Sequence, residues 1–251
     1  MAPADADVTG APSLTPEAAY WDARYAAEGK LWGDGPSELA RLAVARLSFA
    51  AGRGIDVVDL GCGYGRDSIY LAAELGCRVI GVDPSPAAVA AARRARRGGL
   101  DVEFEVADPG RFAAGAEANG VGASGPGEAA ERPDRTFDVV HASNVYQLLS
   151  PAARRDLAAA VVALARPGGL VFLSTLSPRD SQHYAKGDPV PDEERSWFEH
   201  CYLHFCTADE LRADFAALEV LDLEERSYEE RHADGRLHRH TSWFLEARRP
   251  A

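Results

Sequence analysis

Glycines and carboxylates are the residues whose types and spacing point to chemistry in this 251-residue sequence. The pattern D-x-G-x-G-x-G spans residues 59–65, and Asp83 and Asp108 each follow a short apolar segment further along the chain. Glycines let a backbone turn sharply and let a ligand lie against bare main chain. Carboxylates accept hydrogen bonds from hydroxyls and amines. The combination favours a site for a ligand that carries hydroxyls and a positive charge.

The spacing of the glycine turn selects among cofactors. Dinucleotide enzymes carry G-x-G-x-x-G at such a turn, whereas here Gly65 comes one residue early. Asp59 also places a negative charge where a pyrophosphate would have to sit, which disfavours NAD and favours an ammonium or sulfonium. Asp83, 22 residues after Gly61, is placed to accept both hydroxyls of a ribose. Asp108 could accept a hydrogen bond from an exocyclic amine.

The elements that must position these residues alternate between strands and helices. Apolar runs predict strands at 55–60, 78–82, 102–106, 137–141 and 170–175. Capping signals predict a short helix that begins at Thr15, carries Tyr20, Trp21 and Tyr25, and is broken at 33–36. Capping signals and helical spacing also predict helices at 37–50, 66–75, 85–97, 150–165 and 207–217. Segments 218–230 and 237–247, joined by Asp234 and Gly235, predict a closing hairpin. The pattern predicts an α/β fold, a Rossmann-like seven-stranded and mostly parallel sheet with helices on both faces and a C-terminal antiparallel hairpin.

One domain, residues 14–251, accounts for this pattern. Residues 1–13 are predicted to be a flexible N-terminal arm, and residues 14–50 a helical lid. Residues 113–135 show no period and are rich in Gly, Ala, Glu and Pro, which predicts a mobile insertion. Residues 177–206 are expected to form a polar loop on the substrate side.

Charge and composition limit the classes of partner that the protein can bind. The net charge of −12 repels a polyanion, so no nucleic acid partner is expected and a small molecule is the default. No apolar stretch is long enough to cross a bilayer, and the N-terminus has no signal-peptide pattern. We therefore expect no membrane partner, a cytoplasmic location and four reduced cysteines. Nothing in the sequence sets an oligomeric state.

Five segments in register resemble the class I S-adenosylmethionine-dependent methyltransferases. They are Asp59-x-Gly61-x-Gly63-x-Gly65, Val79-Ile80-Gly81-Val82-Asp83, Val106-Ala107-Asp108, Phe137-Asp138-Val139-Val140 and Arg166-Pro167-Gly168-Gly169. The resemblance covers roughly residues 37–176 and implies S-adenosyl-L-methionine as the cofactor. It implies that Asp59 and the turn hold the methionine portion and that Asp83 holds the ribose. Asp108, with Pro109, would meet the adenine edge.

The same resemblance extends the cofactor site. It adds Cys62 within the turn, Pro84 and Ser85 beside the ribose carboxylate, and Ser143 and Asn144 flanking the transferred methyl group. The aromatic N-terminal segment, from Tyr20 through Trp32 to Ser37, and the strand 239–244 are similar to the tellurite-resistance and thiopurine methyltransferase branch. In that branch an aromatic-rich helix covers the cofactor. Trp32 fits such a lid and fits equally a packing role between the N-terminal helices.

The acceptor decides whether a base is needed. A soft nucleophile such as a thiolate needs little help, whereas a hydroxyl or ammonium needs a general base. We rank Tyr146 and His183 first as catalytic candidates, because they follow strand ends at the ligand-facing edge; His141, His204 and Tyr184 rank behind them. For any one of these residues a loop or packing role is about twice as probable.

No metal is expected. His200, Cys201, His204 and Cys206 have ligand-like side chains, but alternate residues of an extended segment face opposite ways, so packing is the better interpretation. Three other histidines, His232, His238 and His240, straddle the hairpin, where exposed polar residues are expected.

The function predicted from the sequence is methyl transfer from S-adenosylmethionine to a small-molecule acceptor by in-line displacement. A non-catalytic module that binds the cofactor is one alternative. A nicotinamide-dependent oxidoreductase is another, and the glycine spacing and Asp59 argue against it.

Overall fold

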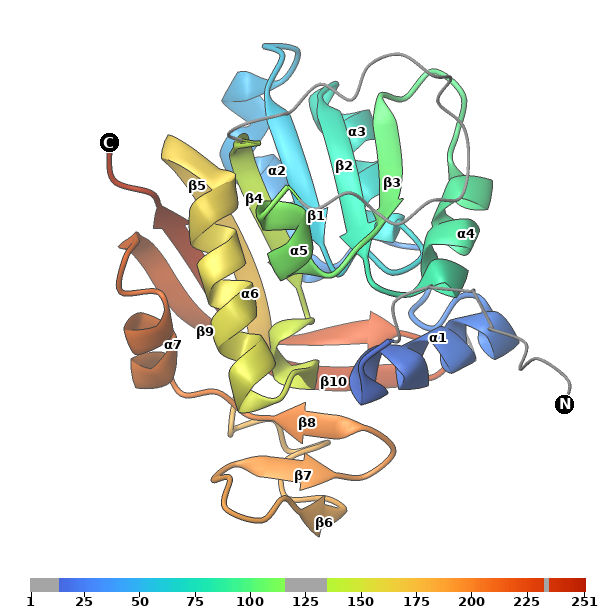
Figure 1. Ribbon diagram of the computed structural model, residues 1–251, viewed down its shortest axis with the longest axis vertical. Coiled ribbons are helices and arrows are strands. Elements are labelled where there is room, and N and C mark those ends of the chain that lie inside the picture. Colours follow the sequence, from blue (N-terminus) through green and yellow to red (C-terminus); the bar gives the residue numbers. More distant parts are fainter. Residues whose placement is uncertain (1–13, 116–134, 233–234) are drawn as a thin grey trace, which may run out of the picture.

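A single seven-stranded sheet organises the protein (Figure 1). The computed structural model describes residues 14–115, 135–232 and 235–251. The predicted arm at 1–13, most of the predicted insertion at 113–135, and Asp234 of the predicted hairpin turn lie outside the described residues.

The strands run in the order β3-β2-β1-β4-β5-β10-β9. Their bounds are β1 Asp56–Leu60, β2 Arg78–Asp83, β3 Val102–Val106, β4 Phe137–Ser143, β5 Ala165–Leu176, β9 Glu219–Arg231 and β10 Leu237–Arg248. The first five pair in parallel, and β10 pairs antiparallel with both β5 and β9. The predicted mostly parallel sheet with a closing antiparallel hairpin is confirmed.

Helices cover both faces of the sheet. The helices are α1 Pro16–Glu28, α2 Glu38–Leu47, α3 Arg66–Leu75, α4 Pro86–Ala95, α5 Pro109–Ala113, α6 Pro151–Leu164 and α7 Ala208–Asp214, with 3₁₀ turns at Ser48–Ala50 and Tyr146–Leu148. Helices α2, α3 and α4 share one hydrophobic cluster with the sheet, and α5, α6 and α7 share another. The five-residue helix α5 was not predicted.

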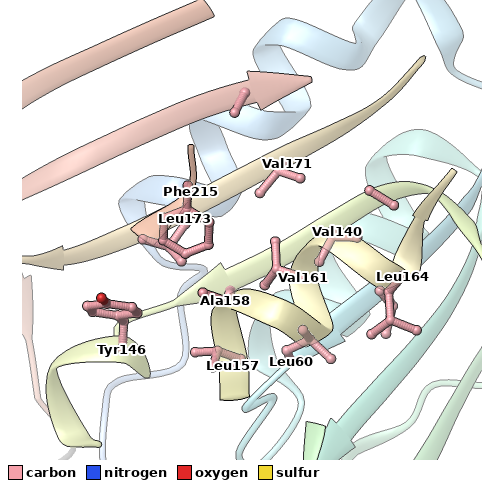
Figure 2. Packing of buried hydrophobic residues seen from close by; sticks show 14 of the residues in the cluster. Leu60, Val140, Tyr146, Leu157, Ala158, Val161, Leu164, Val171, Leu173 and Phe215 are labelled. Atoms are coloured by element: carbon pink, nitrogen blue, oxygen red, sulfur yellow. The ribbon is translucent and has the colours of Figure 1, made fainter. Parts of the chain in front are cut away.

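Alternation along the strands divides the core in two. Successive side chains of a strand point to opposite faces, so Val57 of β1 joins the cluster under α2 and α3 while Val58 joins the cluster under α6. Figure 2 shows the second cluster, where Leu173 of β5 lies near Phe215 and Val161 of α6 packs over the sheet. Each fully buried side chain of this size contributes about 1.5–3 kcal/mol to stability.

Side-chain caps mark where α1, α2, α4 and α7 begin, whereas α3 and α6 begin without a side-chain cap bond. Thr15, Ser37 and Ser85 each accept a hydrogen bond from a backbone N–H three residues on. Thr207 and Glu210 form both bonds of a capping box at α7. These bonds satisfy N–H groups that a helix start leaves without partners.

The segment predicted as a polar loop at 177–206 contains a small antiparallel sheet. Its strands are β6 Asp188–Pro189, β7 Ser196–Phe198 and β8 Tyr202–His204, in that order. Strands of two or three residues are too short to show a period in the sequence. Aromatic contacts hold the segment, since the ring of Phe205 meets those of Tyr184 and Trp197 at 5.2 and 5.7 Å.

Strand β5 also begins earlier than predicted, at Ala165 rather than after the two glycines. Arg249 exchanges backbone hydrogen bonds with Gly168 and Gly169, which extends the pairing with the chain that follows β10. In the part of the chain that the structure describes, no helix has the length and apolar character needed to cross a membrane.

Candidate active site

The glycine turn between β1 and α3 is enclosed by two other segments. Gly61 and Gly63 have φ of 72° and 54°, in the left-handed region that glycine tolerates best. A Cβ on Gly63 would lie 2.6 Å from the hydroxyl oxygen of Tyr25 in α1, and one on Gly61 would lie 2.7 Å from Cγ2 of Val145. The turn therefore requires glycine both for its backbone angles and for the close approach of its neighbours.

Asp59 lies on β1 just before the turn, and both of its oxygens have partners. Oδ1 is 2.8 Å from Nδ1 of His141 on β4, and Oδ2 accepts a 2.5 Å hydrogen bond from the Ser68 hydroxyl. Burial disfavours the charged form of His141, but attraction and hydrogen bonding to Asp59 outweigh burial and raise the pKa of the ring. Asp59 and His141 thus form a buried pair under the turn.

Asp83 ends β2 and is bonded to the glycine turn itself. Its Oδ2 accepts the backbone N–H of Gly63 at 2.8 Å, and its Oδ1 accepts that of Ser85 at 2.9 Å. Burial, with a smaller contribution from the nearby carboxylates of Asp59 and Asp22, raises the pKa of Asp83 to about 6 despite these bonds. A carboxylate in this position would be stabilised by additional hydroxyl donors.

The next two strand ends also carry the predicted residues. Asp108 is exposed and caps α5, its Oδ1 accepting from the N–H groups of Gly110 and Arg111. Asn144, after β4, has a φ of 54°, which is uncommon outside glycine and is concentrated at functional sites. Its backbone N–H is 3.2 Å from the hydroxyl of Ser174 on β5.

These residues line one large cavity of about 2030 Å³. Of the predicted site residues, its walls contain Trp32, Asp59, Gly61, Cys62, Gly63, Asp83, Pro84, Asp108, Pro109, Ser143, Asn144 and His183. Ligand sites usually measure about 300–1,000 Å³. The cavity is therefore large enough for two ligands side by side.

Gly65 and Ser85 were predicted to touch the cofactor, but they are not among the residues that line the cavity. Gly65 caps α3, and a Cβ there would lie 2.7 Å from the Phe104 ring. Ser85 is fully buried, caps α4, and donates its hydroxyl to Asp22 of α1 at 2.7 Å. Both residues shape the site from behind its wall.

Tyr146, predicted as a catalytic residue, lies in the core instead. Its side chain is 1% exposed, packs against Phe215 with 5.9 Å between ring centroids, and donates its hydroxyl to Asp214 (Figure 2). Burial and the bond to Asp214 raise the pKa of the phenol well above its usual value. The 3₁₀ turn Tyr146–Leu148 accounts for this placement, because it directs Tyr146 into the core while its neighbours Val145 and Gln147 line the cavity.

Helix α1 is attached to the cofactor side of the cavity by residues that the sequence did not single out. Asp22 accepts hydrogen bonds from the Ser85 hydroxyl and from the Ala87 N–H, at 2.7 and 2.8 Å, at the start of α4. The hydroxyl of Tyr64, within the glycine turn, donates to the carbonyls of Trp32 and Gly33. The aromatic segment around Asp22 was the one sequence feature that indicated contact between α1 and the ligand site.

Segment 32–37 is also joined to the hairpin and to α3. Asp67 of α3 accepts both the N–H and the hydroxyl of Ser37, at 2.7 and 2.6 Å. Trp32 forms an isolated antiparallel bridge with His232, at the end of β9. The N-terminal segment and the hairpin therefore meet at the wall of the cavity.

The hairpin histidines were predicted to be exposed polar residues, but the structure places them in the wall of the cavity. His240 is only 8% exposed, and His183, His232, His238 and His240 all line the cavity. The rings of His183 and His240 lie 5.3 Å apart, so the chain brings a loop histidine and the hairpin histidines together. The period of β9 and β10 could not reveal this, because segment 177–187 supplies part of the wall.

Two of the cysteines, Cys62 and Cys206, lie in surroundings that bear on their chemistry. Cys62 is buried, and burial together with Asp83 and Asp59 raises the pKa of its thiol well above its usual value, so the thiol is held protonated. His204 and Cys206 approach Glu210, but Glu210 already accepts hydrogen bonds from Arg195 and from the N–H and hydroxyl of Thr207. His200 and Cys201 are not part of that group.

Comparison with known proteins shows relatives with this architecture. A curated relative, the ubiquinone biosynthesis O-methyltransferase of Methylocella silvestris, is 34% identical over 125 residues, which are 49% of this chain and 41% of the relative. The chain thus aligns with less than half of that relative's length.

Three solved structures share the fold. A protein studied for the conversion of a disulfide bond into a thioacetal group in echinomycin biosynthesis is 25% identical, with a TM-score of 0.67 and 93% of each chain covered. A methyltransferase dependent on S-adenosylmethionine from Anabaena variabilis is 17% identical, with a TM-score of 0.68, 95% of this chain and 96% of that chain covered. TehB from Haemophilus influenzae is more distant, at 16% identity and a TM-score of 0.56, with 82% of this chain and 61% of TehB covered.

A family model described as a methyltransferase domain matches residues 31–219, which is well over half of the chain. The match includes the glycine turn and all three carboxylates at the strand ends. The chain therefore belongs to the methyltransferase domain family, and it has the Rossmann-like fold of the class I S-adenosylmethionine-dependent methyltransferases.

Proposed function

We propose that the protein transfers the methyl group of S-adenosylmethionine to a small-molecule acceptor. The observation that carries this proposal is the single cavity, which joins the glycine turn and the strand-end carboxylates to a second wall made by α1, segment 177–206 and the hairpin. Family membership supports the same reaction.

The residues present fit the cofactor. Asp83 is a buried carboxylate that lines the cavity, and burial raises its pKa, so further hydrogen-bond donors would stabilise its ionised form. Two ribose hydroxyls supply such donors. Gly61 and Gly63 leave the wall of the turn without side chains, which lets a ligand approach the backbone. Asp108 at the exposed rim is placed for the adenine edge.

When bound, S-adenosylmethionine supplies a methyl group on a sulfonium, which transfers by in-line displacement. The chain contributes alignment and exclusion of water. Asp59, paired with His141 beneath the turn, holds a buried carboxylate in a fixed position near the place proposed for the methionine portion. Asn144 lines the cavity with its backbone N–H bonded to Ser174, and would flank the transferred methyl group, as the family resemblance implies.

His183 is the candidate for accepting a proton from a hydroxyl or amine acceptor. It lines the cavity, and burial lowers the pKa of its ring despite the nearby carboxylate of Asp180. A lowered pKa keeps the imidazole neutral at physiological pH, which is the form that accepts a proton.

The acceptor wall supports the domain assignments made from the sequence. Residues 14–50 act as the lid, since Tyr25 and Trp32 line the cavity, and residues 177–206 act as the substrate side through His183 and Leu203.

The O-methyltransferase named among the relatives makes an aromatic hydroxyl one reasonable acceptor class to test first. The aromatic α1 supports assignment to the tellurite-resistance and thiopurine branch, although TehB is only a distant neighbour. Four free cysteines support a reducing, cytoplasmic setting.

Calorimetry and turnover test the proposal in sequence. We expect S-adenosylmethionine to bind and NADH not to bind; the reverse result would exclude a methyltransferase in favour of an oxidoreductase. A screen of phenols, thiols, amines and chalcogen oxyanions, measured by release of S-adenosylhomocysteine, then tests catalysis. Cofactor binding without release for any acceptor class would instead support a non-catalytic binding module.

A further inference from the structure

Three histidines on the acceptor wall converge from two parts of the chain. His183 follows β5 in the loop, and His238 and His240 lie two residues apart on β10, so they project from the same face of that strand. One side-chain nitrogen from each lies within 4.8 Å of the other two. We refer to His183, His238 and His240 as the histidine triad.

We propose that the histidine triad binds a divalent transition-metal ion, with zinc as the best match, inside the cavity. Neutral imidazole is the ligand that suits zinc, copper, iron and nickel, whereas magnesium and calcium prefer oxygen. Three protein ligands leave a four-coordinate zinc one open position, which is the arrangement of catalytic rather than structural zinc sites.

A buried carboxylate holds one member of the triad from behind. Asp180 is fully buried, and its Oδ2 lies 3.5 Å from Nδ1 of His240 while accepting the backbone N–H of Thr241 at 2.9 Å. Its Oδ1 accepts the N–H of His183 at 2.9 Å. With Nδ1 facing Asp180, His240 directs Nε2 toward a ligand. Metal-binding histidines characteristically present their second nitrogen to a carboxylate in this way.

Closure of the site requires only side-chain movement. Ligand atoms on a tetrahedral zinc lie about 3.4 Å apart, as follows from zinc–nitrogen bonds of about 2.1 Å. The triad atoms, within 4.8 Å, must therefore close by about 1.4 Å at most, which is within reach of imidazole rotation. The rings of His183 and His240 are nearly parallel, at 11°, and must rotate to point at one centre.

The side chain of Gln182 already occupies one nitrogen of His238 and therefore competes with metal binding there. Its Oε1 accepts the N–H of Arg239 at 2.7 Å, which fixes the amide so that Nε2 faces Nδ1 of His238 at 3.0 Å. An imidazole whose Nδ1 accepts this bond carries its proton on Nε2, so metal binding at either nitrogen of His238 must break the bond to the Gln182 amide. Loss of the Gln182 amide is therefore expected to strengthen metal binding.

The other groups of suitable residues in the described part of the chain are already committed. In the group His204, Cys206 and Glu210, the carboxylate pairs with Arg195 at 2.7 Å, and a cation there would meet the guanidinium. In the group Glu230, His232 and His240, the carboxylate pairs with Arg66 at 2.7 Å. The triad contains no carboxylate that an arginine must release.

The open position suggests what the ion does. All three side chains line the cavity, so the fourth ligand can be an oxygen, nitrogen or sulfur atom of a molecule bound there. A coordinated His183 has no lone pair left to accept a proton, so the ion would take over that role: a hydroxyl bound to zinc loses its proton to solvent far more readily than a free one. This step rests on the proposed function, and binding of the ion does not.

Metal binding is tested on the full chain after removal of any affinity tag. Calorimetry with Zn²⁺, and visible absorption of Co²⁺ as a substitute, are carried out without S-adenosylmethionine. We expect one ion per chain, a loss of affinity of about tenfold or more in His183→Ala and in His240→Ala, and tighter binding in Gln182→Ala. His200→Ala is the matched control, because His200 lines the cavity but lies outside the triad, and its affinity should not change.

Absence of Zn²⁺ binding would overturn the proposal. It would also be overturned if His183→Ala and His240→Ala bound Zn²⁺ with the same affinity as the wild type. Circular dichroism and cofactor calorimetry verify that each variant is folded. His183→Ala removes a partly exposed side chain, so it keeps the test decisive if His240→Ala fails to fold. Zinc binding in a protein that does not bind S-adenosylmethionine would refute the proposed function and leave the metal site standing.

Discussion

Gly63 donates its backbone N–H to Oδ2 of Asp83 over 2.8 Å, so the tip of the glycine turn and the carboxylate at the end of β2 are directly joined. The two features that the sequence places 20 residues apart therefore act as one unit. Any change in the charge of Asp83 alters both the proposed ribose contact and the anchoring of the turn.

Cofactor affinity should depend on pH through Asp83. Its pKa is raised to about 6, and the ionised carboxylate accepts hydroxyl hydrogen bonds better than the neutral acid, so affinity for S-adenosylmethionine should fall as pH falls through about 6. Calorimetry between pH 5 and 8 measures this. Asp83→Asn should bind weakly with no step in that range, and a step retained in Asp83→Asn would assign the titration to another group.

Stability without the cofactor should have the opposite dependence. Because the folded-state pKa of Asp83 lies above its ordinary value of 3.8, folding favours the protonated form. The contribution of this group is full below the ordinary value and is lost as pH rises through about 6. Denaturant unfolding of the wild type and of Asp83→Asn across this range isolates the contribution, and identical pH profiles would contradict the prediction.

Gly63→Ala should damage the site more than an equivalent change elsewhere. The new Cβ would be 2.6 Å from the Tyr25 hydroxyl oxygen and would hold a left-handed φ of 54°, with a backbone cost of about 1–3 kcal/mol. The matched control is Gly52→Ala, which has a φ of 69° and no atom within 4 Å of a Cβ. We expect both variants to lose stability in urea and only Gly63→Ala to lose cofactor affinity as well, by tenfold or more.

Tyr146→Phe should preserve turnover. Tyr146 does not line the cavity, and its hydroxyl donates to Asp214, an exposed residue. Its removal should therefore cost about 0.5–1.5 kcal/mol of stability, the net contribution of one hydrogen bond. Urea unfolding measures the loss, and release of S-adenosylhomocysteine measures turnover. A hundredfold drop in turnover at unchanged stability would restore Tyr146 to the reacting centre.

Asp22→Ala should loosen the lid. The substitution removes two hydrogen bonds that hold α1 to the start of α4, while the Arg24–Glu28 ion pair on the same helix is largely exposed. Trypsin should cleave after Arg24 faster in Asp22→Ala than in the wild type, and cofactor should dissociate faster. Glu28→Ala, the control on the same helix, should change cofactor dissociation little. Equal dissociation rates in Asp22→Ala and wild type would show that the lid does not retain the cofactor.

The sheet, the order of its elements and the cofactor carboxylates could be predicted because each leaves a local pattern. Buried strands are visible as short apolar runs in the sequence. Helix starts are visible as capping residues, such as Thr15, Ser37 and Ser85, whose side chains accept the cap hydrogen bonds. Parallel strands then bring Asp59 and Asp83 to one edge, whatever lies between them.

The acceptor side could not be predicted, because its geometry depends on chain segments that meet only in three dimensions. Tyr146 and Val145 are adjacent in sequence, yet one faces the core and the other the cavity, and a three-residue 3₁₀ turn decides which. Asp180 links His183 to His240, because it accepts the backbone N–H of His183 itself and that of Thr241, next to His240. The hydrophobic periodicity of a sequence does not predict contacts of this kind between distant segments.

The bridge between Trp32 and His232 has a consequence for how the chain folds. It joins residues 200 positions apart, and the entropy of closing so long a loop must be compensated by contacts already formed between them. The mouth of the cavity should therefore be among the last parts of the molecule to assemble, after the parallel strands and their helices have condensed. A folding intermediate with a complete sheet would still lack a closed binding chamber, and ligands that bridge the two segments would stabilise the native state against reopening.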